Sequence, residues 1–130
     1  MRAIRRFTVR PVLPPELSAL ADLVTNLRWS WHPPTQDLFA SLDPALWDEC
    51  GHDPVRLLGG LSGERLTELR SDDYFQGRLA AAHADLEQYL TGPRWYQTHA
   101  EEGAPEAIAY FSPEFGITAV LPQYTAAGRR

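Results

Sequence analysis

Apolar residues recur at helical spacing along most of the chain and predict a series of helices. Pro14-Pro15-Glu16 suits the first turn of a helix, because proline is tolerated there and an acid complements the helix dipole. The helix predicted from residue 17 has one covered face, formed by Leu17, Leu20, Leu23, Val24, Leu27 and Trp31. Pro33-Pro34 ends this helix or starts the next, since the residue before a proline avoids the α region.

Four shorter helices are predicted after these prolines. The first has an apolar stripe of Leu38, Phe39 and Leu42. Each of the other three begins at a residue that can cap a helix N-terminus, namely Asp43, Asp53 and Ser62, and a proline follows both aspartates. Glycines 59–60 mark the end of the third of these helices.

The longest helix is predicted from Asp73 to about Leu90, after the capping sequence Ser71-Asp72-Asp73. Its apolar positions are Tyr74, Phe75, Leu79, Ala82, Leu86, Tyr89 and Leu90. Thr91-Gly92-Pro93 follows as a stop signal.

A short apolar run near the C-terminus, Ala107 to Phe111, predicts a buried strand. Pro113 ends it, because proline cannot donate to a strand ladder. Glu114 then follows in a loop, either in solvent or directed at a ligand. A single strand needs neighbours for its backbone groups. Either residues 6–12 pair with it, or its partners lie on sequence that is not part of this chain.

The fold class that follows is mainly α. A helical domain of several short-to-medium helices, residues 1–105, leads into residues 106–130. The second part is interpreted as the first strand and loop of a truncated α/β domain.

Composition narrows the functional class. The formal net charge of −5 means that the chain has no excess of basic residues, so nucleic acid is not an expected partner. No apolar run approaches the ~20 residues of a membrane span, and the basic N-terminus does not lead into a secretory signal. The lone Cys50 excludes an internal disulfide framework and fits a reducing compartment. We therefore expect a cytoplasmic protein.

Candidate chemistry is sparse in the sequence. The histidines at 32, 52, 83 and 99 stand on different elements without the paired spacing of a metal site, so no metal is expected. The carboxylate pairs 72–73 and 101–102 are interpreted as a helix start and a solvated connector. Catalytic carboxylates would have to flank a substrate from separate elements.

The aromatic cluster of residues 26–33 has two interpretations. Trp29 and Trp31 either pack in the core, which we favour, or belong to a platform on which sugars stack. Such a platform would also use Trp47 and Trp95, and it would require these rings to lie in solvent.

Two stretches of the chain carry recognisable motifs. The first stretch, residues 20–58, contains Asn26-Leu27-Arg28-Trp29-Ser30-Trp31, Leu38-Phe39, Leu42-Asp43-Pro44, Leu46-Trp47 and His52-Asp53-Pro54-Val55. It resembles the N-terminal helical region of the α-glucan (glycogen or maltodextrin) phosphorylases of the short bacterial and archaeal branch. The second stretch looks like the motif that opens their catalytic domain. It consists of Ile108-Ala109-Tyr110-Phe111-Ser112-Pro113-Glu114-Phe115-Gly116-Ile117, followed by Leu121-Pro122-Gln123-Tyr124.

The resemblance implies a glycosyltransferase-type enzyme with two Rossmann domains and pyridoxal phosphate, which transfers glucose from a glucan end to phosphate. It places Glu114 near the sugar and phosphate subsites, as a substrate-binding residue when the rest of the enzyme is present. The family continues after the tyrosine with a Ser-Gly-Gly-Leu-Gly type loop, whereas this chain has Thr125 to Arg130. All twelve basic residues are arginines, so no lysine can carry the cofactor.

The expected function is therefore that of a phosphorylase N-terminal domain, truncated after Tyr124 and inactive alone, with no catalytic or cofactor-binding residue of its own. α-Glucan would be a ligand only in the presence of the catalytic domain. The alternative is a stand-alone helical interaction module that binds a phosphorylase or another enzyme of glycogen metabolism. Strand 107–111 would then mediate that pairing or self-association.

Overall fold

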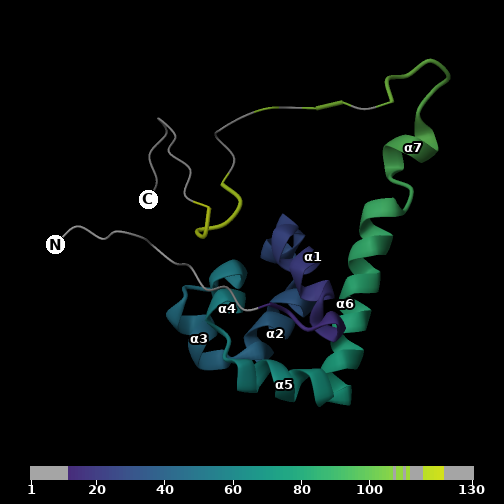
Figure 1. The fold of residues 1–130 in the computed structure, drawn as a ribbon. Coiled ribbons are helices and arrows are strands. Elements are labelled where there is room, and N and C mark those ends of the chain that lie inside the picture. The colour runs from purple at the N-terminus through teal and green to yellow at the C-terminus, as the bar shows by residue number, and fades with distance from the viewer. Residues whose placement is uncertain (1–11, 107, 110, 112–115, 122–130) are drawn as a thin grey trace, which may run out of the picture.

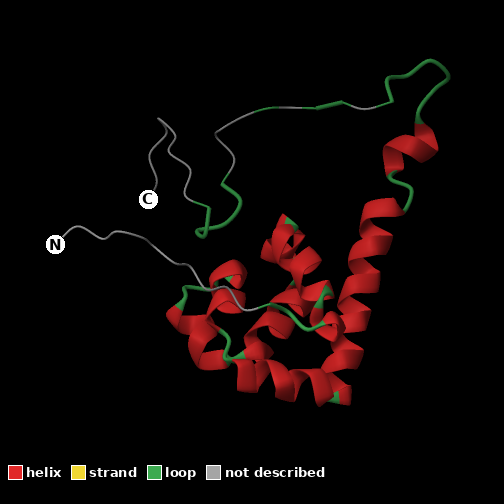
Figure 2. Cartoon of the chain, viewed as in Figure 1, coloured by secondary structure: helices red, strands yellow, loops and turns green. Residues whose placement is uncertain are grey.

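The computed structural model describes residues 12–106, 108–109, 111 and 116–121. Nine helical elements occur in these residues, and no strand does. They are η1 (Pro15–Leu17), α1 (Ala19–Thr25), η2 (Leu27–Trp31), α2 (Pro33–Leu42), α3 (Pro44–Glu49), α4 (Pro54–Gly60), α5 (Gly63–Ser71), α6 (Asp73–Thr91) and α7 (Trp95–His99). The predicted mainly helical class is confirmed, as the red ribbons of Figure 2 show.

The shorter helices form a body beside α6, the longest helix (Figure 1). Helices α1, α2 and α5 pack against α6, and the C-terminal end of α6 leads to α7 away from this body. None of the described helices combines the length and apolar character needed to cross a membrane.

A single apolar core joins these helices, and Phe39 of α2 lies at its centre with no exposed surface. Its ring contacts Trp29 edge to face, with centroids 6.3 Å apart, and Trp47 at 6.0 Å. Such aromatic pairs add to the stabilisation from buried area. Helix α6 contributes only Phe75, Leu79, Ala82 and Leu86 to the core.

The predicted helix starts are confirmed by hydrogen bonds from the capping side chains. Asp43 accepts from Leu46 N–H, Asp53 from Val55 and Arg56, Ser62 from Arg65, and Asp72 from Phe75. Each cap satisfies a backbone donor that has no partner within its own helix. These local signals fix where α3, α4, α5 and α6 begin.

Replacing Asp72 with alanine is expected to lower the free energy of unfolding by about 1 kcal/mol, since Phe75 N–H then loses its 3.0 Å acceptor. Urea unfolding measures the change. Asp73→Ala is the matched control, because Asp73 is the first helical residue and not the cap. Equal losses in the two variants would contradict the assignment of Asp72 as the cap.

The helix predicted through Trp31 is interrupted at Asn26, which is a correction. Helix α1 ends at Thr25, and Asn26 has extended backbone angles, φ −96° and ψ 116°. Its side chain accepts a hydrogen bond from Arg28 N–H at 3.0 Å and starts the 3-10 helix η2. A short amide side chain competes in this way with a continuing helix.

The buried strand predicted for residues 107–111 is not confirmed. Ile108, Ala109 and Phe111 belong to no strand and are exposed, Phe111 at 92%. The described part of the chain contains no other strand that would pair with this backbone. Residues 107 and 110, like residues 6–11, lie outside the described residues, and the division at residue 105 stays a prediction.

Candidate functional site

Few of the predicted site residues lie together. Glu114 falls outside the described residues, so its substrate-binding role stays a prediction. Asp72 caps α6, as expected, and Glu101 and Glu102 are exposed in the connector. The carboxylate pairs therefore face no common cavity.

The tryptophans do not form the platform that sugar stacking would need. Trp29 and Trp47 are buried, as the packing interpretation predicts. Trp31 is 58% exposed at the end of η2, so packing was the wrong interpretation for this ring. Trp95 is 73% exposed on α7 and stacks on His99. Two of the four rings are thus unavailable to a ligand.

The four histidines have separate partners. His52 stacks on Trp47, and His99 stacks on Trp95, each with centroids 4.9 Å apart. His83 and His32 pair with Asp22 and Asp85. Within the described residues, no group of three or more His, Cys, Asp or Glu side chains could hold a metal ion.

Asp85 on α6 organises the most buried polar cluster. Its Oδ2 accepts a charge-assisted hydrogen bond from Arg28, whose side chain is only 13% exposed, and lies 3.4 Å from His32 Nε2. The other ring nitrogen of His32 lies 2.8 Å from the hydroxyl of buried Thr35. This cluster joins η2 and the start of α2 to α6.

A cavity of about 440 Å³ lies beside this cluster. Its lining combines cationic, acidic and small apolar side chains: His32, Pro34, Asp37, Leu38, Arg78, Ala81, Ala82 and Asp85. Because Asp85 already faces Arg28 and His32, it is committed to holding the helices together. The arrangement is that of a structural cluster beside an open and mainly apolar cavity.

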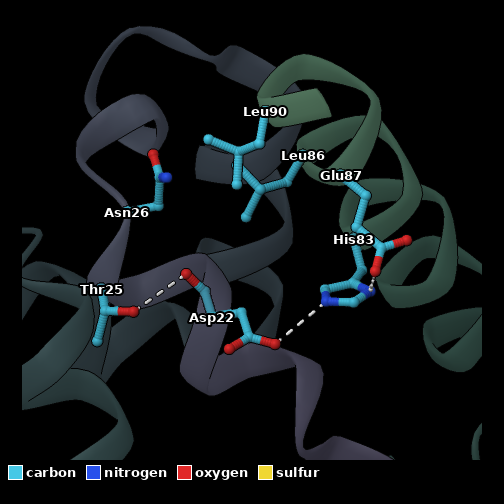
Figure 3. A pocket seen from close by; sticks show the side chains of 7 residues that line it. All are labelled: Asp22, Thr25, Asn26, His83, Leu86, Glu87 and Leu90. Carbon is cyan, nitrogen blue, oxygen red and sulfur yellow. Dashed lines mark hydrogen bonds and ion pairs between the residues drawn. The ribbon is translucent and has the colours of Figure 1, made fainter. Parts of the chain in front are cut away.

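A second cavity, of about 370 Å³, lies between α1 and α6 (Figure 3). His83 Nε2 lies 3.1 Å from Asp22 Oδ2, and its Nδ1 lies 3.9 Å from Glu87 Oε1. Among the described residues that line this cavity, Thr25 has the one hydroxyl, and it donates to the Ala21 carbonyl at 2.9 Å and not to His83. Leu86 and Leu90 form the apolar side of the cavity.

Sequence reasoning missed both clusters. Arg28 and Asp85 are 57 positions apart, and Asp22 and His83 are 61 apart. No spacing within one element connects them. The arginine and histidine of residues 26–33 were noticed only as part of an aromatic cluster, and the interruption at Asn26 is what turns them toward α6.

The fold and these clusters define a class: a helical domain in which partly buried polar side chains hold helices together. Residues 13–121 match the model of a family described as "Protein of unknown function (DUF3417)", and the chain belongs to this family. This match spans all nine helical elements of the described residues.

Enzymes of glucan metabolism are among the similar proteins. The chain is 56% identical to a glycogen phosphorylase of Mycobacterium tuberculosis over 96% of its length, but it covers 15% of that protein. It is 32% identical to a maltodextrin phosphorylase of Thermococcus litoralis, over 90% of this chain and 14% of that protein. A glycogen phosphorylase of Aquifex aeolicus is 30% identical over 81% of this chain and 14% of that enzyme.

These matches confirm the resemblance to the N-terminal region of α-glucan phosphorylases. The chain spans about one seventh of the length of these relatives. No solved structure matches it significantly.

Proposed function

We propose that the chain is the N-terminal helical domain of an α-glucan phosphorylase and serves glycogen or maltodextrin breakdown together with a catalytic domain. The 56% identity to a glycogen phosphorylase over 96% of the chain carries this proposal. Identity at this level over a chain whose elements η1 to α6 share one core supports a domain of the same structure and the same role.

The chain by itself is proposed to be catalytically inactive. In the described residues, the Thr25 hydroxyl beside the Asp22–His83 pair donates to the backbone, and the carboxylate of Asp85 is already engaged by Arg28. The residues present do not fit pyridoxal phosphate either, because a covalent link to that cofactor needs a lysine and the sequence has none. In the complete enzyme, we place Glu114 near the sugar and phosphate and the whole protein in the cytoplasm.

The isolated chain is expected to release no sugar phosphate from glycogen in the presence of inorganic phosphate and pyridoxal phosphate. The M. tuberculosis glycogen phosphorylase, assayed at the same molar concentration, is the positive control. Phosphate-dependent release by the isolated chain that disappears on heat denaturation would contradict the proposal.

The second candidate function is a stand-alone interaction module, and the exposure of Ile108 and Phe111 favours it. Exposed apolar side chains that gather into a patch mark surfaces that bind other proteins. Light scattering of the chain with and without the full-length M. tuberculosis enzyme separates the two functions. A stable mixed complex supports the module, whereas a monomer that ignores the enzyme supports the domain.

A further inference from the structure

The end of α6 and the start of α7 carry a surface that departs from the predicted core. Tyr89 and Leu90 were expected to be buried, yet both are exposed, and the neighbouring Trp95 is 73% exposed. We define the α6–α7 surface as Tyr89, Leu90, Arg94 and Trp95. Arg94 lies over the Tyr89 ring and is the chain neighbour of Trp95, so these side chains lie in one region. Exposed apolar patches mark interaction sites in soluble proteins.

The side chains of this surface are held in place by contacts within the chain. The guanidinium carbons of Arg28 and Arg94 lie 4.6 Å and 4.3 Å from the centroid of the Tyr89 ring. Trp95 stacks on His99 with an angle of 11° between the rings. Because the aromatic and arginine side chains are already ordered, a partner would lose little conformational entropy in binding them.

A hollow adjoins the surface and extends it toward the following segment. Its volume is about 440 Å³, and Arg94, Tyr96, Gln97, Glu106 and Ile108 line it. The Tyr96 hydroxyl donates a hydrogen bond to the Pro105 carbonyl, which ties the connector to α7. The surface is therefore hollowed as well as apolar, a shape that admits a protruding side chain.

The two arginines beside Tyr89 differ in their charge partners. Arg28 is paired with Asp85, whereas Arg94 forms no ion pair with any described residue. A carboxylate on a partner would complement Arg94. The chemistry that fits is an apolar protein surface with an acidic residue opposite Arg94.

We propose that the α6–α7 surface binds the catalytic part of the same phosphorylase polypeptide. This inference rests on the proposed function. The matched relatives are about seven times longer than this chain, so most of each polypeptide is available to cover a face of the domain. Helix α7 lies apart from the body in which α1 to α5 are packed, so a large partner has access to it (Figure 1).

The test compares the isolated chain with an exchange enzyme, in which these 130 residues replace the matching region of the M. tuberculosis glycogen phosphorylase. Hydroxyl-radical footprinting reports the exposure of each aromatic ring. Trp95 is expected to react at least about fivefold more slowly in the exchange enzyme, because a central interface ring is almost fully covered. Tyr74, 76% exposed at the other end of α6 beside Arg78, is the matched control and should react equally in both proteins.

Trp95→Ala provides a second readout. It is expected to leave the thermal midpoint of the isolated chain unchanged and to lower that of the exchange enzyme, while Tyr74→Ala lowers neither. An active exchange enzyme in which Trp95 stays reactive overturns this inference and leaves the proposed function intact. An inactive exchange enzyme counts against the proposed function itself. Protection of Trp95 in the isolated chain that grows with concentration would assign the surface to a second copy and overturn the inference.

Discussion

Phe39→Ala is expected to lower the free energy of unfolding of the chain by about 3–5 kcal/mol. The side chain is completely buried between Trp29 and Trp47, so the substitution removes apolar contacts and leaves a cavity that two rigid rings cannot fill. Since small domains are stable by only about 5–15 kcal/mol, this loss is a large fraction of the total stability.

Urea unfolding followed by tryptophan fluorescence measures this effect. Phe111→Ala is the matched control, because it removes the same side chain from a position that is 92% exposed. The control is expected to change stability by less than about 0.5 kcal/mol. If the two variants had equal stability, Phe39 would not be the centre of the core.

Asp85→Ala is expected to cost about 1–3 kcal/mol, because Arg28 would be left mostly buried without its carboxylate. Asp85 itself is 44% exposed, and solvent screening keeps the loss below that of a fully buried pair. The exposed pair Asp48–His52 offers the control, and Asp48→Ala should have a much smaller effect.

A double-mutant cycle with Arg28→Ala isolates the contribution of the pair. The two losses should be strongly non-additive, with a coupling of about 0.5–3 kcal/mol, since both substitutions remove the same interaction. Additive losses would show that Asp85 acts through His32 or through helix propensity instead.

Local signals explain which parts of the fold could be predicted. The caps Asp43, Asp53, Ser62 and Asp72 act on backbone groups two or three residues away, so the sequence alone reveals them. The end of α1 was not predicted. At Asn26, a hydrogen bond of the side chain to the backbone competes with continuation of the helix. Helical spacing does not report that competition.

The polar clusters depend on packing between distant segments and were not predictable. The contact of Asp85 with Arg28 exists only because α6 lies against the segment that contains η2. The exposure of Tyr89 and Leu90 has the same origin: both fit the apolar stripe of α6, but the body covers them only in part, Tyr89 through Arg28 and Leu90 beside the cavity at α1. Periodicity identifies a face, and tertiary structure decides how much of it is covered.

The rate of phosphate-dependent sugar release by the exchange enzyme tests the central claim most directly. A phosphorylase domain that is 56% identical to the one it replaces should support a rate within about tenfold of the parent enzyme, since tenfold corresponds to only ~1.4 kcal/mol. The control is the same exchange carrying Phe39→Ala, which should lose activity as the domain unfolds. A well-folded exchange enzyme with no phosphorolysis would contradict the assignment of this chain as an α-glucan phosphorylase domain.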